Sequence, residues 1–286
     1  MRYLNVCLAA LLFLFAPRAW AEYDFPVEPI DVVIPCVEKD LETLELCIHS
    51  IRKYCTEVRH IFVVSEERYT KNARWFPEER FGISKYDIAK LLCADHKEAE
   101  NFAENHPRIG WIYQKFLKLY APFVIPNISS NVLVVDADTI FLRKVEFLRE
   151  QRYGYLATGS QHHKPYFEHM QRTIPGLKRL YGEHSGICHH MLFQRAILDD
   201  FIKTIEKEHH KVAWKALVLT LDQEELHKSC MSEYELYFNF ALMKTNKVRI
   251  RSLMWKNVSS LNDVALARKE GFDFVVCHSY LRHGSK

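Results

Sequence analysis

The alternation of short apolar runs with a helical repeat most constrains the fold of this chain. Residues 30–36, IDVVIPC, form a short apolar run that is stopped by Pro35, and residues 59–67 contain a second run, IFVV. Between them, apolar side chains recur every three or four residues from Leu41 to Cys55, the spacing of one helix face. Strands that are apolar along their whole length are typical of parallel sheets covered on both faces. This order predicts an α/β fold.

The rest of the chain continues this pattern. Residues 106–123 carry a helical apolar stripe that we expect to end at Pro122, with Gln114, Lys115 and Lys118 lying off the stripe. Together the segments predict one domain, residues 22–286, with a mostly parallel central sheet flanked by helices. Further strands are expected at 131–135, 153–160, 185–194, 247–255 and 272–282, and further helices at 85–100, 195–210 and 232–245.

The first 21 residues have the pattern of a cleaved secretory signal. A basic Arg2 precedes an apolar run over residues 4–16, and the segment ends in the small-x-small sequence Ala19-Trp20-Ala21. We therefore expect a signal peptide at 1–21 and a location in the secretory pathway or outside the cytoplasm. The alternative is an uncleaved segment that anchors the protein to a membrane.

Composition excludes several other classes. The net charge of +3 comes from scattered basic residues, so it makes no case for nucleic-acid binding. Only nine glycines occur, and none forms a dinucleotide or P-loop phosphate cradle. Removal of Cys7 with the signal leaves seven cysteines without C-x-x-C spacing. Buried thiols with one or two disulfides are therefore expected, rather than a metal cluster.

Two aspartates follow the apolar strand 131–135, NVLVV. In an extended segment, residues i and i+2 point to the same side, so Asp136 and Asp138 would share the carboxyl edge of the sheet, where ligands bind in open α/β sheets. Two neighbouring carboxylates repel each other, and a divalent cation removes that cost. Because such cations are held by one or two carboxylates together with phosphate oxygens, the pair predicts a metal and phosphate site.

Two other interpretations of this pair stay open. The first is structural, since aspartates favour the turn that ends a strand. The second is a haloacid-dehalogenase-like phosphatase, in which two aspartates of a D-x-D-x-[TV] pattern follow an apolar strand and the first is a nucleophile. Here Ile140 stands where Thr or Val belongs, and Thr139 comes one place early.

The segments around the aspartates resemble a glycosyltransferase of the GT-A type. VLVVDADTIFLRKV, residues 132–145, is similar to the D-x-D strand of that superfamily, and GWIYQKFLKLYAP, residues 110–122, resembles the preceding helix in a poorly characterised, largely bacterial branch. The blocks HHMLFQRAIL, SEYELYFNFAL and HSYLR follow in the same order, so the similarity covers residues 30–282. It implies a GT-A-like domain, a nucleotide-sugar donor, Mn²⁺ or Mg²⁺, and transfer to a hydroxyl of an unidentified glycan, lipid or protein acceptor.

The resemblance also implies roles for particular residues. Asp136 and Asp138 would contact the metal and the donor diphosphate or ribose, with Asp138 counted as catalytic. GT-A enzymes often add a late histidine to the metal, and His278 is the candidate, with His283 as the alternative. Pro35 stands where the nucleoside pocket of the superfamily begins, although a simple strand stop explains it equally well.

Two helices carry further candidates. Gln114 and Lys118 are one turn apart, so both could reach the donor phosphates, unless they belong to a solvated face. Ser232 predicts an N-cap with Glu235 completing a capping box. That leaves Glu233 as the candidate for a catalytic base or acceptor ligand, the alternative being a charge that favours the helix N-terminus.

Two adjacent histidines, His189 and His190, follow Cys188. On a strand one of them would face the core and the other the cleft, and we expect an acceptor contact from this pair. Together with His184 they fit no standard zinc spacing.

The leading hypothesis is therefore a metal-dependent glycosyltransferase. The alternatives are a haloacid-dehalogenase-like phosphatase and a non-catalytic protein that binds nucleotides or sugars. Nucleotide sugars are abundant in the cytosol and in the Golgi lumen but not in a bacterial periplasm. A secreted transferase would need a eukaryotic secretory lumen, delivery into a host cell, or an N-terminus that is not a true signal.

Overall fold

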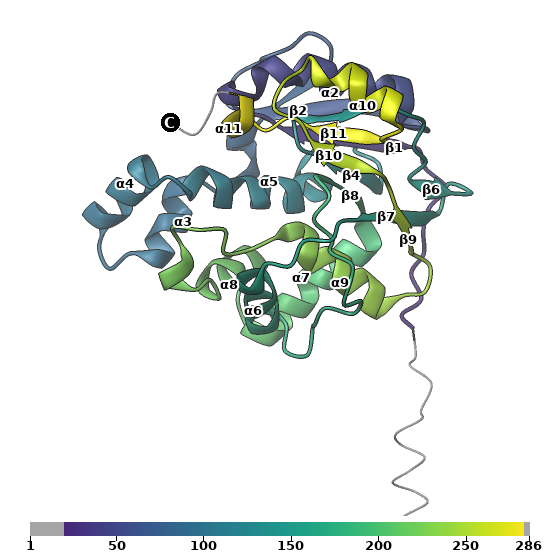
Figure 1. The fold of residues 1–286 in the computed structure, drawn as a ribbon. Helices are drawn as coiled ribbons and strands as arrows, with labels where there is room; N and C mark the ends of the chain where they lie inside the picture. Colours follow the sequence, from purple (N-terminus) through teal and green to yellow (C-terminus); the bar gives the residue numbers. More distant parts are fainter. Residues whose placement is uncertain (1–19, 283–286) are drawn as a thin grey trace, which may run out of the picture.

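The computed structural model describes residues 20–282 and confirms the α/β class (Figure 1). The signal predicted at 1–21 lies almost entirely outside these residues, and His283 lies wholly outside them. The strands are β1 (Ile30–Pro35), β2 (Val58–Ser65), β3 (Arg74–Pro77), β4 (Asn131–Val135), β5 (Thr139–Phe141), β6 (Leu148–Arg149), β7 (Tyr153–Thr158), β8 (His190–Gln194), β9 (Arg249–Ser252), β10 (Trp255–Asn257) and β11 (Phe274–Val276). The helices are α2 (Leu41–Tyr54), α3 (Lys85–Leu92), α4 (His96–Asn105), α5 (Ile109–Val124), α6 (Lys164–Thr173), α7 (Arg195–His209), α8 (Ala213–Leu219), α9 (Glu233–Lys244), α10 (Asp263–Glu270) and α11 (Ser279–Arg282), with 3-10 turns η1 (Glu38–Asp40), η2 (Glu78–Phe81) and η3 (Gln223–Glu225).

A five-stranded sheet with the order β3-β2-β1-β4-β8 forms the centre of the fold. Strands β3, β2, β1 and β4 run parallel, and β8 is antiparallel to β4, so the sheet is mostly parallel as predicted. All residues of β1 and β4 are buried, which explains why these strands read as apolar runs.

The two faces of this sheet belong to two separate hydrophobic cores. Successive side chains of a strand point to opposite faces, so Val33 joins one core and its neighbours Val32 and Ile34 join the other. The first core packs against α5, α7 and α9, and the second packs against α2 and β5 (Figure 1). The sheet is therefore covered on both faces by hydrophobic side chains, and the ends of its strands are the places open to polar groups.

A small sheet, β10-β11-β5, brings the C-terminal part of the chain to the end of β4. β5 continues directly from the turn that follows β4 and pairs antiparallel with β11, where Thr139 faces Val276. This pairing places the residues after β11 beside Asp138. A third sheet, β6-β7-β9, lies beside β8.

Several elements differ from their predicted limits. Residues 85–100 form two helices, and Pro122 lies inside the last turn of α5, where it removes only one backbone donor. The strand predicted at 185–194 begins only at His190, and 272–282 contains both a strand and the short helix α11. Helix α9 is buried on nearly all sides and is not the amphipathic helix that its sequence suggested.

The seven cysteines of the described segment are all free thiols, so the expected disulfides are absent from residues 20–282. Burial raises the pKa of Cys36 and of Cys188 to about 12, so these two thiols stay protonated at neutral pH. No helix within the described segment has the length and apolarity needed to cross a membrane.

Candidate active site

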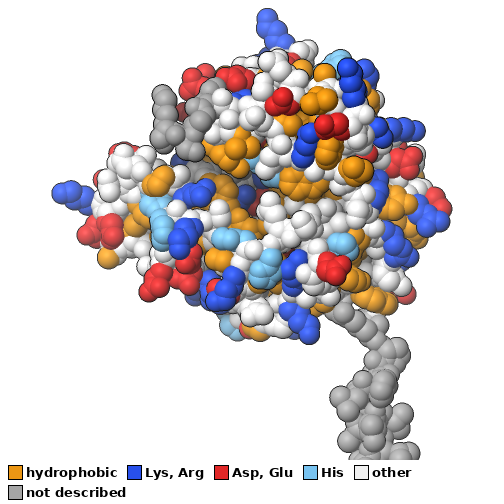
Figure 2. All heavy atoms as spheres, viewed as in Figure 1, with side chains coloured by type: hydrophobic (Ala, Val, Ile, Leu, Met, Phe, Trp, Pro, Cys, Tyr) orange, Lys and Arg blue, Asp and Glu red, His pale blue; other side chains and the backbone are white. Residues whose placement is uncertain are grey.

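A cavity of about 500 Å³ opens where the carboxyl end of β4 meets α5, α9 and the segment after β11. Figure 2 shows the molecule hollowed near the middle of one face, between the part that carries α2 and α10 and the part that carries α6 and α9. The cavity collects most of the residues that the sequence nominated, although they come from segments far apart in the chain. Its lining includes Gln114, Lys115, Asp136, Asp138, His189, Ser232, Tyr234 and His278.

Asp138 and His278 form one pair in this cavity. The backbone N–H of Cys277 donates to the carbonyl oxygen of Asp138 at 2.9 Å, an extension of the pairing between β5 and β11. His278 Nδ1 lies 2.7 Å from Asp138 Oδ2, and the His278 ring stacks on Tyr280 at 5.0 Å between centroids. The other oxygen, Oδ1 of Asp138, is buried without a hydrogen-bond partner. The pair thus leaves one carboxylate oxygen beside the cavity without a partner.

His189 approaches the first aspartate from the neighbouring strand. β8 pairs antiparallel with β4, and the N–H of Asp136 donates to the carbonyl oxygen of His189 at 2.9 Å. His189 Nδ1 lies 3.3 Å from Asp136 Oδ2, while its Nε2 is buried without a partner. The residue has φ 62°, in the left-handed region that costs a non-glycine residue energy. This conformation turns the side chain of His189 into the cavity.

His190 occupies the core, which corrects its predicted role as an acceptor contact. Its side chain is 1% exposed and packs edge-on against Phe141, Phe147 and Phe274, with ring centroids 4.9 to 5.4 Å away. Burial among these aromatic rings lowers its pKa to about 3, so the imidazole is neutral. One histidine of the pair therefore faces the cavity and the other the core, as predicted, although His189 precedes β8 in a left-handed conformation and does not lie on the strand.

Lys118 is buried beneath the cavity, which fits neither its predicted contact with the donor phosphates nor the alternative of a solvated helix face. It is 1% exposed, and its ammonium contacts two carboxylates, Asp136 Oδ1 at 2.5 Å and Glu233 Oε1 at 2.8 Å. Tyr234 also donates its hydroxyl to Asp136 Oδ1 at 3.0 Å. Although burial opposes ionisation, the Lys118 ammonium and His189 hold the pKa of Asp136 well below its usual range. A lysine therefore supplies the cation that this aspartate was expected to obtain from a metal.

Glu233 joins Lys118 to a second buried lysine. Its carboxylate is 0% exposed and lies 3.2 Å from the ammonium of Lys115, which is 7% exposed. Despite burial, the two lysines lower the pKa of Glu233. A fully buried carboxylate that holds two ammonium groups cannot reach an acceptor hydroxyl, so the predicted base role of Glu233 does not fit. Its position in the first turn of α9 also lets the helix N-terminus stabilise its charge.

The predicted capping box of α9 is only half formed. Ser232 Oγ accepts the N–H of Glu235 at 3.2 Å, as expected of an N-cap. The Glu235 carboxylate instead accepts the N–H of Gly186 at 3.1 Å, the hydroxyl of Ser185 and the amide of Asn239. Glu235 therefore ties α9 to the segment that leads into His189.

A second cavity, of about 260 Å³, adjoins the first and contains Pro35. It lies between the end of β1 and the first turns of α5, and Trp111, Gln114 and Arg108 line both cavities. Gln114 is half-buried at this junction, whereas Lys118 points away into the buried cluster. The two residues predicted to act together therefore have different environments.

Several cavity residues were missed by sequence reasoning. Lys39, Arg108 and Lys115 bring three cations to the lining of the cavity, and Lys115 also packs its ammonium 4.4 Å from the Trp111 ring centre. Burial raises the pKa of Asp40, another lining residue, to about 6. The D-L-E-T-L sequence around Asp40 reads as an ordinary helix start, and Lys115 has the spacing of a surface lysine, so neither carried a signal.

The residues present fit a divalent cation that shares its ligands with a substrate. Asp138 offers the unpartnered Oδ1, and His278 beside it supplies an imidazole nitrogen. Within residues 20–282, no group of three or more His, Cys, Asp and Glu side chains is arranged to hold a metal alone. A cation such as Mg²⁺ is commonly held by one or two carboxylates, with phosphate oxygens and water completing its shell.

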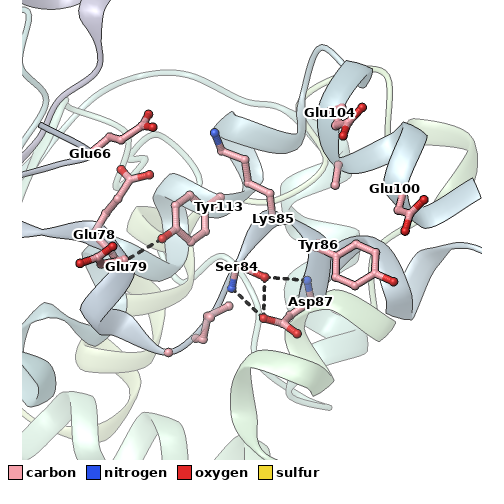
Figure 3. Close-up of a pocket in the computed structure, with 13 residues that line it drawn as sticks. Glu66, Glu78, Glu79, Ser84, Lys85, Tyr86, Asp87, Glu100, Glu104 and Tyr113 are labelled. Carbon is pink, nitrogen blue, oxygen red and sulfur yellow. Dashed lines mark hydrogen bonds between the residues drawn. The ribbon is translucent and has the colours of Figure 1, made fainter. Parts of the chain in front are cut away.

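A larger groove, of about 840 Å³, borders the second cavity but lacks comparable chemistry (Figure 3). Three of its polar residues have local structural roles: Ser84 and Asp87 form the capping box of α3, and the hydroxyl of Tyr113 donates to the carbonyl oxygen of Glu78 at 3.2 Å. Size alone therefore does not identify the site. The smaller cavity has side chains of both charges and unpartnered buried atoms.

Sequence comparison places the chain in a known family. No curated protein matches it. Residues 27–271 match the family described as a family of unknown function, DUF6492, and this span includes Asp136, Asp138 and Glu233 but ends before His278. Because the match covers most of the chain, the protein belongs to the DUF6492 family of unknown function.

Proposed function

We propose that the protein is a metal-dependent glycosyltransferase that transfers a sugar from a nucleotide-sugar donor to a hydroxyl acceptor. The observation that carries this proposal is the buried, unpartnered Oδ1 of Asp138 beside His278, in a cavity whose lining also includes lysine and arginine side chains. A diphosphate is the ligand class that such a combination of acidic and basic residues suits. Its oxygens can complete the shell of a cation on Asp138, and basic side chains can neutralise its remaining charge.

Each part of the donor has a corresponding place in this proposal. The nucleoside would occupy the 260 Å³ cavity beside Pro35 and Trp111, and the diphosphate would cross the shared boundary near Gln114 into the larger cavity. There Lys115 and Arg108 would bind phosphate oxygens. The bound Mn²⁺ or Mg²⁺ would supply a Lewis acid that stabilises the charge developing on the diphosphate as the sugar leaves.

The buried cluster keeps the surrounding groups in fixed positions. Lys118 neutralises Asp136, and Glu233 holds the ammonium of Lys115 beside the cavity. Lys115, Lys118, Asp136 and Glu233 together contribute two positive and two negative charges, so the cluster has no net charge of its own. The donor would thus meet prearranged groups, which is the condition for effective electrostatic stabilisation. His189 remains a proposed acceptor contact, since its Nε2 has no other partner.

The contacts of Asp136 argue against its use as a phosphatase nucleophile. Its Oδ1 already accepts hydrogen bonds from Lys118 and Tyr234, and its Oδ2 lies beside His189. A nucleophile needs an oxygen that is open to the reacting phosphorus, and these contacts occupy both oxygens.

The proposal is tested by incubating the purified protein with a panel of nucleotide sugars, with Mn²⁺ and with chelator, and measuring nucleotide diphosphate release. We expect release from at least one donor only with the metal. Asp138→Asn should abolish this release without changing the melting temperature by more than a few degrees, whereas the exposed control Asp24→Asn should retain it. Full activity of Asp138→Asn would exclude the proposal. Metal-dependent nucleotide binding without turnover would instead identify a binding protein.

The N-terminal segment adds a proposal about location. If residues 1–21 are a signal, the enzyme acts in a secretory lumen or outside the cytoplasm. Expression of the full chain with a C-terminal tag, followed by N-terminal sequencing of the mature protein, tests this. Sequencing that starts near residue 22 would support cleavage, and a retained Met1 would refute it.

A further inference from the structure

A fourth concavity, of about 700 Å³, lies at the amino end of the central sheet. It is bounded by the end of α2, the start of β2, the loop 66–73 and the start of β3. At this end Ile30 pairs with Val58, whereas Pro35 pairs with Val64 at the other end. The length of β1 therefore separates this concavity from the candidate active site by roughly 16 Å.

Positive charge dominates this surface, which we call the basic concavity. Its lining has one carboxylate, Glu57, and five Lys or Arg side chains. The whole chain is nearly balanced, with 39 Lys and Arg against 36 Asp and Glu, so the excess is local. The five basic residues are Arg52, Arg59, Arg68, Lys71 and Arg74.

Only one of the five has a carboxylate partner. Arg59 forms two hydrogen bonds to the buried Asp31, from Nε to Oδ1 at 3.0 Å and from Nη2 to Oδ2 at 2.6 Å. Within residues 20–282, none of the other four forms an ion pair. Like charges gathered in one concave surface repel each other, and an anion that binds all of them removes this cost.

Local structure accounts for Arg52 but not for the remaining three cations. Arg52 lies in the last turn of α2, where the helix dipole favours a positive charge. Arg68 makes one long hydrogen bond to the carbonyl oxygen of Thr70, at 3.4 Å, and Arg74 lies over the Phe62 ring at 5.7 Å. Most guanidinium N–H groups of these two residues are therefore available to a ligand.

The loop that carries these cations is held in place by its own contacts. Glu45 on α2 accepts hydrogen bonds from the Thr70 hydroxyl and from the Asn72 side-chain amide, the latter at 2.8 Å. The Asn72 N–H also donates to the Thr70 hydroxyl oxygen at 3.0 Å. Glu45 thus fixes the loop and forms no ion pair with Lys71 or with the arginines. These contacts therefore hold the loop residues Arg68 and Lys71 in place.

We propose that the basic concavity binds clustered phosphate groups, distinct from the donor diphosphate. Guanidinium groups match phosphate oxygens with paired N–H donors. Several phosphate groups are needed to pair with all four cations that line this concavity of about 700 Å³. The ligand is either a soluble oligophosphate or the phosphate headgroups of an anionic lipid surface. Both present the same chemistry, and the experiment separates them.

Calorimetric titration of the full chain with inorganic tripolyphosphate, at about 0.15 M salt and with chelator, tests the site. The variant Arg68→Ser/Lys71→Ser/Arg74→Ser should weaken binding at least tenfold. The control Lys207→Ser/Lys211→Ser/Lys215→Ser removes the same charge from exposed positions elsewhere and should bind within twofold of the unmodified protein. All three substituted side chains of the test variant are exposed, so thermal melting should stay unchanged.

A second arm identifies the source of the phosphate and excludes the donor site. Lys115→Met should leave tripolyphosphate binding intact. Cosedimentation with phosphatidylcholine vesicles, with and without phosphatidic acid, then shows whether anionic headgroups bind and whether the test variant loses them. Vesicle binding that depends on phosphatidic acid and on the three cations assigns a lipid surface, and tripolyphosphate binding alone assigns a soluble ligand. Absence of both, equal loss in the control variant, or loss only in Lys115→Met overturns the proposal.

Discussion

The ammonium of Lys118 lies 2.5 Å from Oδ1 of Asp136, although the two residues belong to different elements and Lys118 is 1% exposed. This ion pair changes the meaning of the two-aspartate motif. Asp136 is neutralised from within the protein, whereas Asp138 keeps a buried oxygen without a partner. The two carboxylates, separated by one residue, therefore have different environments.

Removing Lys118 should destabilise the protein strongly. Lys118→Met leaves the Asp136 carboxylate without its ammonium partner and removes one of the two that hold Glu233, and the loss of one member of a buried ion pair costs about 3 to 5 kcal/mol. Urea unfolding measures the loss. The double variant Lys118→Met/Glu233→Gln should be less destabilised than the sum of its single variants, because the second substitution removes a carboxylate that the first left with only one of its two ammonium partners. Strict additivity would show that the two residues do not interact.

Lys115 should matter more for donor binding than for the fold. Lys115→Met leaves Glu233 paired with Lys118 but removes a cation that faces the cavity. We expect kcat/KM for the nucleotide sugar to fall about 100-fold, the order of a lost electrostatic contact to a developing charge. The matched control is Lys90→Met, which removes an exposed lysine on α3. Equal effects of the two substitutions would contradict the assignment.

Stability should fall in acid because of His169, a buried residue remote from the cavity. Its Nε2 bonds to the carbonyl oxygen of Leu217 at 3.0 Å, and burial lowers its pKa from 6.5 to about 4. Between pH 6.5 and pH 4, His169 is protonated in the unfolded chain but neutral in the folded chain. The contribution of neutral His169 to the free energy of unfolding is therefore complete above about pH 6.5. It is lost as pH falls toward 4, by up to roughly 3 kcal/mol.

Urea unfolding at several pH values measures this slope. His169→Gln, which retains an N–H donor for Leu217 but does not titrate, should reduce the slope between pH 6.5 and 4. An unchanged slope would show that His169 is not responsible.

Gly186 should tolerate no side chain. A Cβ at this position would lie 2.6 Å from Phe238 Cβ and 2.7 Å from the carbonyl oxygen of Tyr234, so α9 would have to move. Gly186→Ala should cost about 1 to 3 kcal/mol and should also reduce activity, because Tyr234 contacts Asp136. Gly182→Ala is the matched control, since nothing lies within 4 Å of its added carbon. Thermal unfolding of both variants tests the contrast.

The sequence by itself determined the class of fold and the location of the site. Buried strands must be apolar, helices on a sheet must show a 3.6-residue repeat, and a polar pair directly after a buried strand must stand at the sheet edge. Asp136 and Asp138 could be nominated for this reason. The alternation of a strand likewise indicated that only one of His189 and His190 would face the cavity.

Tertiary structure alone decided which charges meet. The pairing of β5 with β11 brings His278 to Asp138 across 140 positions, and the packing of α5 against α9 brings Glu233 to Lys118 across 115. The buried ion pairs of Lys115 and Lys118 could not be predicted, because a helical repeat records hydrophobicity and not the position of a distant carboxylate. A buried ion pair depends on partners remote in sequence, so local pattern could place the aspartates but could not show that a lysine neutralises the first while the second keeps an unpartnered oxygen.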